Sequence, residues 1–274
     1  MSTLGGDGPI PVGLGGGGGS LPVADPASLL SGATASRLVG TDASGDGTLL
    51  TAAQVKALLY PVTADPMTGS GWTTAADAGC TAAWAASTLT LHADAGVTTS
   101  STGSERSGLI PASECYDVMA RIDFVAGSGS ASENISLWAG RDASNAVIAQ
   151  LWANGDVGVG ILSGGSWTPL LAPVAATSSG DRTGGDLWVR ISRSRTSLAV
   201  YWGVGSGGAR PTSWTCIYAT PLASAGSGGA QTPTTLTVSQ GTYVRLDAYA
   251  ASAPAALTVD VLAIVTADQS GAAL

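Results

Sequence analysis

The sequence of 274 residues is poor in charged, catalytic and thiol side chains. Charged residues make up only 11%, there is one histidine, and there are three cysteines. No apolar run reaches the roughly 18 consecutive residues that a membrane-spanning helix needs, which argues against membrane insertion. The formal net charge of −8 and the pI of about 4.4 repel a phosphate backbone, so nucleic acid is not expected as a partner.

Groups for acid, base or nucleophilic catalysis are scarce. His92 lies in a Thr-Leu-Thr-Leu-His alternation that predicts a strand residue, and no G-x-S-x-G elbow accompanies it. The sequence contains three glutamates, none in an E-x-D-x-x-E arrangement: Glu105, Glu114 and Glu133. Hydrolysis by an aspartate pair is the alternative, because Asp247 and Asp260 could face one another across adjacent strands. We expect no enzymatic activity.

Ligands for a resident metal ion are equally few. Cys80, Cys115 and Cys216 are odd in number and far apart, which indicates core or surface thiols rather than a disulfide framework or a zinc site. Four oxygen-bearing side chains flank two neighbouring predicted strands: Asp142, Asn145, Asn154 and Asp156. They could hold Ca²⁺ as in some lectin-like sandwiches, although turn formation is the commoner role of such residues. No cofactor and no metal site are predicted.

Glycine and proline are abundant, with 39 and 13 copies, and both concentrate near the N-terminus. Residues 1–35 carry a run of five glycines and several prolines, and they can bury too little surface to fold alone. They lack the basic and apolar regions of a secretion signal, and no Lys-Ser/Thr follows the glycine run as a phosphate loop requires. We interpret this segment as an extended tether that attaches the chain to other proteins.

Residues 36–66 predict a turn followed by one short helix. Thr51 and Gln54 form the S/T-x-x-Q pattern of a capping box, Leu50 and Val55 can form a hydrophobic staple, and Pro61 ends the helix. A helix of about two turns is marginal in water, so it must pack on something. Self-association into a trimer is our hypothesis for this element.

From Trp72 onward, the sequence alternates between apolar and polar residues in short runs separated by turn-forming clusters. This pattern predicts ten strands in two packed sheets. The predicted strands are residues 88–92, 116–125, 134–140, 146–152, 157–162, 187–192, 197–204, 214–219, 242–250 and 257–266. One face of three of these strands is expected to form the core: Val118, Ala120, Ile122 and Phe124; Leu187, Val189 and Ile191; Leu257, Val259, Val261 and Val265.

Two segments resemble known families. Residues 187–222, LWVRISRSRTSLAVYWGVGSGGARPTSWTCIYATPL, resemble the W-x-R-I-x-R … L-x-V-Y-W … S-x-W pattern of concanavalin A-like and laminin-G-like jelly rolls. The Asp-Gly of the last element is replaced here by Ala209, Arg210 and Pro211, so the resemblance is to the fold rather than to one family. Residues 36–59, SRLVGTDASGDGTLLTAAQVKALL, resemble the short repeat that precedes the distal domain in many fibre and spike proteins of tailed phages and gene transfer agents.

The aromatic residues are biased toward rings with polar atoms, since there are 8 Trp and 6 Tyr but a single Phe. Such rings suit stacking against sugars and wet interfaces. Alternation places a set of aromatic and polar side chains on the non-core side of their strands, with Gly158 and Gly160 leaving room beside them. The residues predicted to bind carbohydrate are Trp138, Gln150, Trp152, Arg190, Tyr201, Arg245 and Asp247. Trp188 and Tyr249 are expected to be exposed on the same side.

Together these observations predict an all-β chain: a concanavalin A-like jelly-roll sandwich at residues 67–274, preceded by the Gly/Pro-rich segment and the short helix. The resemblances imply a fibre or spike subunit on a virion or phage-like particle, and the trimer hypothesis for the short helix fits such a subunit. The lack of a secretion signal and the low surface charge predict synthesis in the host cytoplasm and release by lysis. Its expected partners are host surface polysaccharide and, through residues 1–60, other particle proteins. The alternatives are a structural decoration or connector protein without glycan binding, and a bacterial carbohydrate-active enzyme domain.

Overall fold

A computed structural model describes residues 39–41, 47–49, 62–96, 101–110, 115–193, 197–221 and 243–268. The chain divides into two units, Met1–Val55 and Lys56–Leu274. In the first unit, β1 (Val39–Thr41) pairs with β2 (Gly47–Leu49) in an antiparallel ladder. The tether expected at residues 1–35 and the helix expected at residues 51–60 lie outside the described residues.

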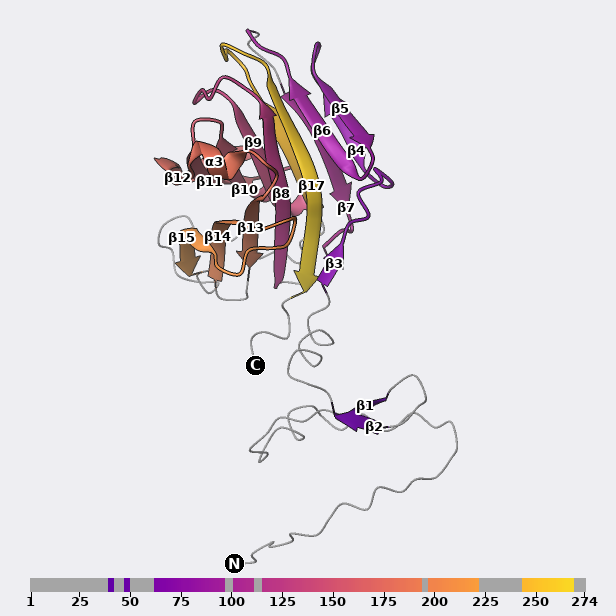
Figure 1. Cartoon of the computed structure of the whole chain (residues 1–274). Coiled ribbons are helices and arrows are strands. Elements are labelled where there is room, and N and C mark those ends of the chain that lie inside the picture. The colour runs from indigo at the N-terminus through magenta and orange to yellow at the C-terminus, as the bar shows by residue number, and fades with distance from the viewer. Residues whose placement is uncertain are drawn as a thin grey trace, which may run out of the picture. The chain divides into compact units, whose positions relative to one another are not determined.

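The second unit is a sandwich of two antiparallel sheets, which lie face to face in Figure 1. The seven-stranded sheet has the order β12 (Ser166–Ala175), β11 (Asp156–Ser163), β10 (Asn145–Trp152), β9 (Asn134–Asp142), β16 (Tyr243–Tyr249), β7 (Ser101–Ser107) and β4 (Thr73–Ala76). The eight-stranded sheet has the order β15 (Thr215–Pro221), β14 (Ser197–Val204), β13 (Leu187–Arg193), β8 (Tyr116–Ala126), β17 (Leu257–Asp268), β6 (Thr88–Ala93) and β5 (Thr81–Ala85). Its remaining strand, β3 (Val62–Ala64), pairs with the end of β17.

All ten predicted strands are present, with bounds that differ by no more than a few residues, and the all-β prediction is confirmed. The sequence did not predict β1, β2, β3, β4, β5, β7 and β12. Among the described residues the sandwich has one helix, the four-residue α3 (Ser179–Arg182), whose first turn is closed by a capping box between Ser178 and Asp181. The described residues include no helix with the length and apolar content to cross a membrane.

The core lies between the sheets and consists of the side chains that alternation predicted, with one exception. Val118, Ile122, Val189 and Val259 are each fully buried between the sheets, as expected. A register shift between Val261 and Ala263 in β17 turns the rest of that strand over, because one extra residue exchanges the two faces. Ile264 therefore enters the core, and the prediction that Val265 lies there was wrong.

Val265 instead belongs to a small apolar cluster on the outside of the eight-stranded sheet. Met119 and Trp188 complete the buried part of this cluster, and Trp214 packs against it. The loop between β14 and β15 covers Trp188, since a Cβ on Gly205 would lie 3.0 Å from its Nε1. The expectation that Trp188 is exposed was wrong for this reason: its side chain points outward but is 2% exposed.

The two ends of the sandwich differ in their connections. The strand β3 pairs with Val265–Ala267 near the end of β17, so the chain enters and leaves the sandwich at one end. Thr258, near the start of β17, pairs with Ala126, after which β8 turns into the loop that precedes β9. The ends of the twelve-residue β17 are roughly 35 Å apart at about 3.4 Å per residue. The β8–β9 loop is therefore far from the point where the chain enters the sandwich.

Candidate functional site

Five of the seven predicted carbohydrate-binding residues lie together on the outer face of the seven-stranded sheet. In the register of the sheet, Gln150 is opposite Ser136, which is in turn opposite Asp247. Trp138 is opposite Arg245 in the next row on one side, and Trp152 extends β10 on the other. Neighbouring strands are about 4.8 Å apart, so these side chains cover an area the size of a short oligosaccharide.

Two tryptophan rings lie directly against the glycines of β11. A Cβ on Gly158 would come within 2.9 Å of the ring of Trp152, and a Cβ on Gly160 would overlap the ring of Trp167. Both glycines are buried, which corrects the expectation that they leave room for a ligand: the space above them is filled by indole rings. Trp167 is itself 45% exposed, so its outer surface remains open to solvent.

We name this surface, defined by Trp138, Gln150, Trp152 and Trp167, the aromatic face. The three rings surround the amide of Gln150, which forms no hydrogen bond among the residues that the structure describes. Ile148, which points the same way between Trp138 and Gly160, is 2% exposed because its neighbours cover it. The result is a set of apolar platforms around a polar amide, which is the arrangement that sugar rings need for stacking and directional hydrogen bonds.

The packing of Trp167 on Gly160 gives a testable coupling. Gly160→Ala is expected to lower the free energy of unfolding by about 1–3 kcal/mol, because its Cβ displaces the ring. In a Trp167→Ala background the same change is expected to cost little or to stabilise the strand, since the obstructing ring is gone. Urea denaturation of the two single variants and the double variant measures the coupling. Additive effects would contradict this packing.

A charged network borders the aromatic face on the side of β16. The Arg245 guanidinium lies 3.0 Å from Asp247 and 3.6 Å from Glu105, and its Cζ is 5.0 Å from the centroid of the Trp138 ring. The Tyr243 hydroxyl donates a 2.6 Å hydrogen bond to Glu105. Burial raises the pKa of Tyr243, and its hydrogen bond to Glu105 raises it further. Two carboxylates thus hold Arg245 over Trp138. The guanidinium therefore positions the Trp138 ring and is not a free cation for a ligand.

Asp247 is one of the predicted residues whose pKa is shifted. Burial raises the pKa of its carboxyl, the Arg245 guanidinium opposes that rise, and the negative charges of Asp77 and Glu105 add to it. A folded-state pKa above that of the unfolded chain means that the folded protein binds more protons between the two values. The Asp247 contribution to stability is therefore fully present below its unfolded pKa and is lost as the pH rises through the raised one.

An NMR titration of the Asp247 carboxyl should accordingly show a midpoint above its ordinary value of 3.8. Arg245→Gln should move this midpoint further up, because it removes the charge that opposes the rise. A midpoint at or below 3.8, or one that falls in Arg245→Gln, would be inconsistent with this electrostatic account.

Arg190 and Tyr201, the two other predicted residues, lie on the opposite side of the molecule. Their strands belong to the eight-stranded sheet, where they pair directly with each other, so the prediction of one common site was wrong for them. Arg190 lies 2.6 Å from Asp117, and its Cζ is 5.4 Å from the centroid of Tyr201 and 5.7 Å from that of Trp214. These contacts occupy the guanidinium within the chain. Tyr249, by contrast, is 40% exposed beside the aromatic face, as expected.

The residues considered for Ca²⁺ form turns at opposite ends of β10. Asp142 accepts hydrogen bonds of 2.9 Å from the Ser144 backbone N–H and the Asn145 amide at one end. Asn154 accepts a 3.1 Å hydrogen bond from the Asp156 backbone N–H at the other end. The strand between them is eight residues long, so the four side chains do not converge on one ion. In the part of the chain that the structure describes, no group of three or more His, Cys, Asp and Glu residues is placed to hold a metal.

The remaining candidate groups for chemistry also separate in space. Asp247 is on the seven-stranded sheet and Asp260 on the eight-stranded sheet, so the pairing considered for an aspartate hydrolase was wrong. Asp260 accepts a 2.6 Å hydrogen bond from Thr90. His92 is a strand residue, as predicted, with its Nδ1 3.0 Å from the Thr258 hydroxyl.

The cysteines behave as the sequence indicated. Cys80 and Cys115 are buried, and Cys216 is exposed. No disulfide joins them, and the Sγ of Cys80 lies 3.4 Å from the backbone nitrogen of Asp94. They are therefore core and surface thiols.

Trp167 is the residue of the aromatic face that the sequence analysis missed. It follows a Ser-Gly-Gly-Ser turn and pairs with Leu162, so its side chain shares the outer face with Gly158 and Gly160. That turn, directly after the alternating run 157–162, was the available signal for a hairpin that brings Trp167 onto this face. The prolines at positions 169 and 173 hid the strand, because proline argues against a central strand.

The two stacked antiparallel sheets define a lectin-like jelly-roll β-sandwich. No protein-family model matches the sequence, and no curated protein sequence matches it significantly. Among solved structures, the fold is similar to the exoplasmic/lumenal domain of VIP36 in its Ca²⁺- and Man3GlcNAc-bound form, with a TM-score of 0.50, 11% identity, and coverage of 73% of this chain and 84% of that chain. The Ca²⁺-bound form of the same domain gives a TM-score of 0.50 at 12% identity, covering 75% of this chain and 88% of that chain.

A xylan β-1,4-xylosidase from Bacillus halodurans C-125 is also similar, with a TM-score of 0.47, 13% identity, and coverage of 74% of this chain and 38% of that chain. At these identities the likenesses extend to the fold alone. The two stacked antiparallel sheets and the likeness to the VIP36 domain confirm the concanavalin A-like fold that residues 187–222 predicted.

Proposed function

We propose that the chain is a non-enzymatic recognition subunit on the surface of a phage-like particle, and that its sandwich binds host cell-surface polysaccharide through the aromatic face. The observation that carries this proposal is the group of three tryptophan rings around the amide of Gln150 on one outer face of the sandwich, with Trp138 and Trp152 half-buried and Trp167 45% exposed. The VIP36 domain, a sugar-bound protein of similar fold, supports a saccharide as the ligand class. The neighbouring carboxylates are held by Arg245 and Tyr243, which favours binding over hydrolysis.

The placement on a particle rests on the resemblance of residues 36–59 to the repeat in phage fibre and spike proteins. Residues 1–60 then attach the chain to other particle proteins, and the short predicted helix assembles three copies. Because the chain enters the sandwich at one end, the rest of the domain can extend from the particle. Weak sugar sites that are repeated in a trimer and around a particle give tight overall attachment through effective concentration.

The test uses the full chain and polysaccharide purified from the cells that the particle adsorbs to. Surface plasmon resonance should show saturable binding that free polysaccharide competes away, and the same polysaccharide should block particle adsorption. Sedimentation velocity of the full chain should show a trimer. Absence of binding to polysaccharide of susceptible cells would overturn the recognition role, and release of new reducing ends would overturn its non-enzymatic character.

A structural decoration or connector role is the second candidate, and one observation favours it. The edge strand β12 exposes Trp167 and Val174 by 45% and 44%, and an exposed apolar edge is a typical place for another protein to pair. Imaging of the particle distinguishes the two candidates. Density from another particle protein over β12 and the aromatic face would support the connector, whereas an open face directed away from the particle supports recognition.

A further inference from the structure

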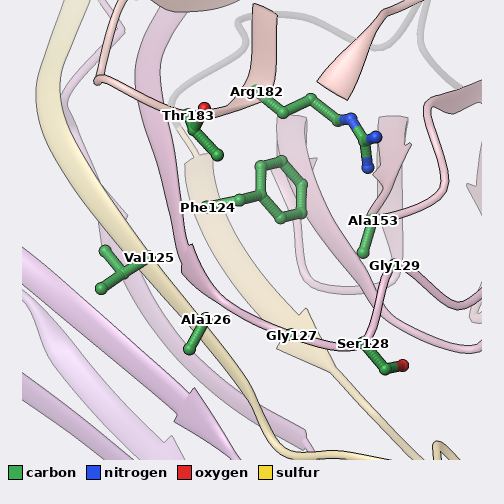
Figure 2. Close-up of a pocket in the computed structure, with 9 residues that line it drawn as sticks. All are labelled: Phe124, Val125, Ala126, Gly127, Ser128, Gly129, Ala153, Arg182 and Thr183. Atoms are coloured by element: carbon green, nitrogen blue, oxygen red, sulfur yellow. The ribbon is translucent and has the colours of Figure 1, made fainter. Parts of the chain in front are cut away.

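A pocket of about 290 Å³ opens at the end of the sandwich remote from β3. Figure 2 shows the Phe124 ring in its middle, with the Arg182 guanidinium on one side near Ala153 and the chain from Gly127 to Gly129 on the other. The pocket is just below the size range of drug-sized ligand sites, so it suits a single sugar residue. It lies at the loop end and shares none of the four residues that define the aromatic face.

Arg182 gives the pocket its charge. It is the only charged side chain among the lining residues, which are otherwise apolar or carry a hydroxyl. Its Nε donates a 3.2 Å hydrogen bond to the Ser178 backbone carbonyl, which fixes the base of the guanidinium. Among the described residues, Arg182 forms no ion pair. Partial burial lowers the pKa of Arg182, and the negative charge of Asp181 only partly opposes this. A bound anion would stabilise the charged guanidinium.

The opposite wall is a loop whose shape is fixed from behind. Glu133 is fully buried, and its carboxylate accepts hydrogen bonds from both the backbone N–H and the hydroxyl of Ser128. A Cβ on Gly127 would lie 2.7 Å from the Glu133 carboxylate, and Gly129 has a φ of +74°. These positions favour glycine, so the wall has little side-chain bulk. Glu133 lies behind this wall and is not among the lining residues, and its carboxylate is engaged by Ser128.

From this geometry we infer that the pocket binds a carboxylate-bearing sugar, such as a hexuronate residue of an acidic polysaccharide. The Arg182 guanidinium pairs with the carboxylate in the two-pronged geometry that arginine favours. Phe124 contacts the apolar side of the sugar ring, and the narrow loop at residues 127–129 admits its hydroxyl groups. The site is independent of the aromatic face, and it selects an acidic sugar although the chain as a whole is acidic.

The test is a titration of the ¹⁵N-labelled full chain, followed through the amides of residues 127–129, with sodium glucuronate, glucose and sodium acetate as probes. We expect glucuronate to saturate these shifts in the millimolar range, and glucose and acetate to bind at least about tenfold more weakly. Arg182→Gln should weaken glucuronate roughly 10- to 100-fold, the factor for a lost charge-assisted hydrogen bond. Ala153→Leu, which fills the pocket without changing its charge, should abolish binding.

The matched control is Arg210→Gln, which removes the same charge from an exposed arginine of the β14–β15 loop, outside the pocket lining, and should leave glucuronate binding unchanged. Trp138→Ala should also leave it unchanged, so a failure of the aromatic face is distinguishable from a failure of this pocket. Equal affinity for glucose or acetate, an equal loss in Arg210→Gln, or wild-type affinity in Arg182→Gln would each overturn the proposal. Wild-type affinity in Ala153→Leu would overturn the pocket as its location.

Discussion

Replacement of Trp138 and Trp152 by alanine together is expected to reduce the affinity for host polysaccharide at least roughly 100-fold, and each single replacement roughly 10- to 30-fold. Both rings project from the seven-stranded sheet on either side of Gln150, with strand pairing fixing their positions. Aromatic side chains at the centre of an interface carry most of its binding energy, because they bury a large rigid surface at little entropic cost. Surface plasmon resonance with immobilised polysaccharide measures the loss.

The matched control is Trp214→Ala. Trp214 is also half-buried on an outer face, but it belongs to the cluster with Trp188 on the eight-stranded sheet. Its replacement removes one indole from the other side of the sandwich and should leave affinity unchanged, while circular dichroism establishes that all variants are folded. Equal losses in Trp214→Ala and in the Trp138 and Trp152 variants would place the sugar elsewhere.

Arg106→Ala is expected to lower the free energy of unfolding by about 2–4 kcal/mol, the largest stability effect among the predictions. The Arg106 guanidinium lies 2.7 Å from the Asp65 carboxylate, whose side chain is only 1% exposed, whereas that of Arg106 is 29% exposed. Asp65 follows β3, and its backbone N–H donates a 2.8 Å hydrogen bond to the Ile264 carbonyl. The ion pair thus joins the start of the sandwich in one sheet to β7 in the other.

The cost arises because Arg106→Ala leaves a buried carboxylate without its cation. The double variant Asp65→Asn, Arg106→Ala should be more stable than Arg106→Ala alone, since a neutral amide is less costly to bury. Asp65 also accepts hydrogen bonds from the Met67 backbone N–H at 2.8 Å and from the Trp72 indole at 3.3 Å, so Asp65→Ala should destabilise as well. Urea denaturation in which Arg106→Ala matches the wild type would show that the pair contributes nothing to stability.

The strands that the sequence predicted are those in which β-branched and aromatic residues alternate with polar ones. In β8 and β13, the residues that pack between the sheets alternate regularly and are apolar apart from the buried Arg193 at the end of β13, so period-2 alternation was a sufficient signal. The missed strands lack it: β7 reads STGSERS and places Thr102 and Ser104 in the interior, and β5 reads TAAWA. Their strand structure depends on neighbours that pair with them, which local sequence does not reveal.

The direction of side chains was more predictable than their surroundings. All seven predicted binding residues point away from the core, because alternation within a strand fixes the face. Long-range pairing decides which sheet a strand joins. The local sequence therefore could not predict that the seven binding residues would be divided between both outer faces. The covering of Trp188 by a later loop has the same cause. The roles of Gly158 and Gly160 could be assigned only once the rings above them were placed.

The most direct test of the central claim, that the aromatic face binds the polysaccharide, is an NMR titration of the tryptophan indole N–H signals with an oligosaccharide fragment of that polysaccharide. The account predicts that the signals of Trp138, Trp152 and Trp167 shift and saturate together, while those of Trp188 and Trp214 stay fixed. Shifts confined to Trp188 and Trp214, or binding that moves none of these indoles, would contradict it.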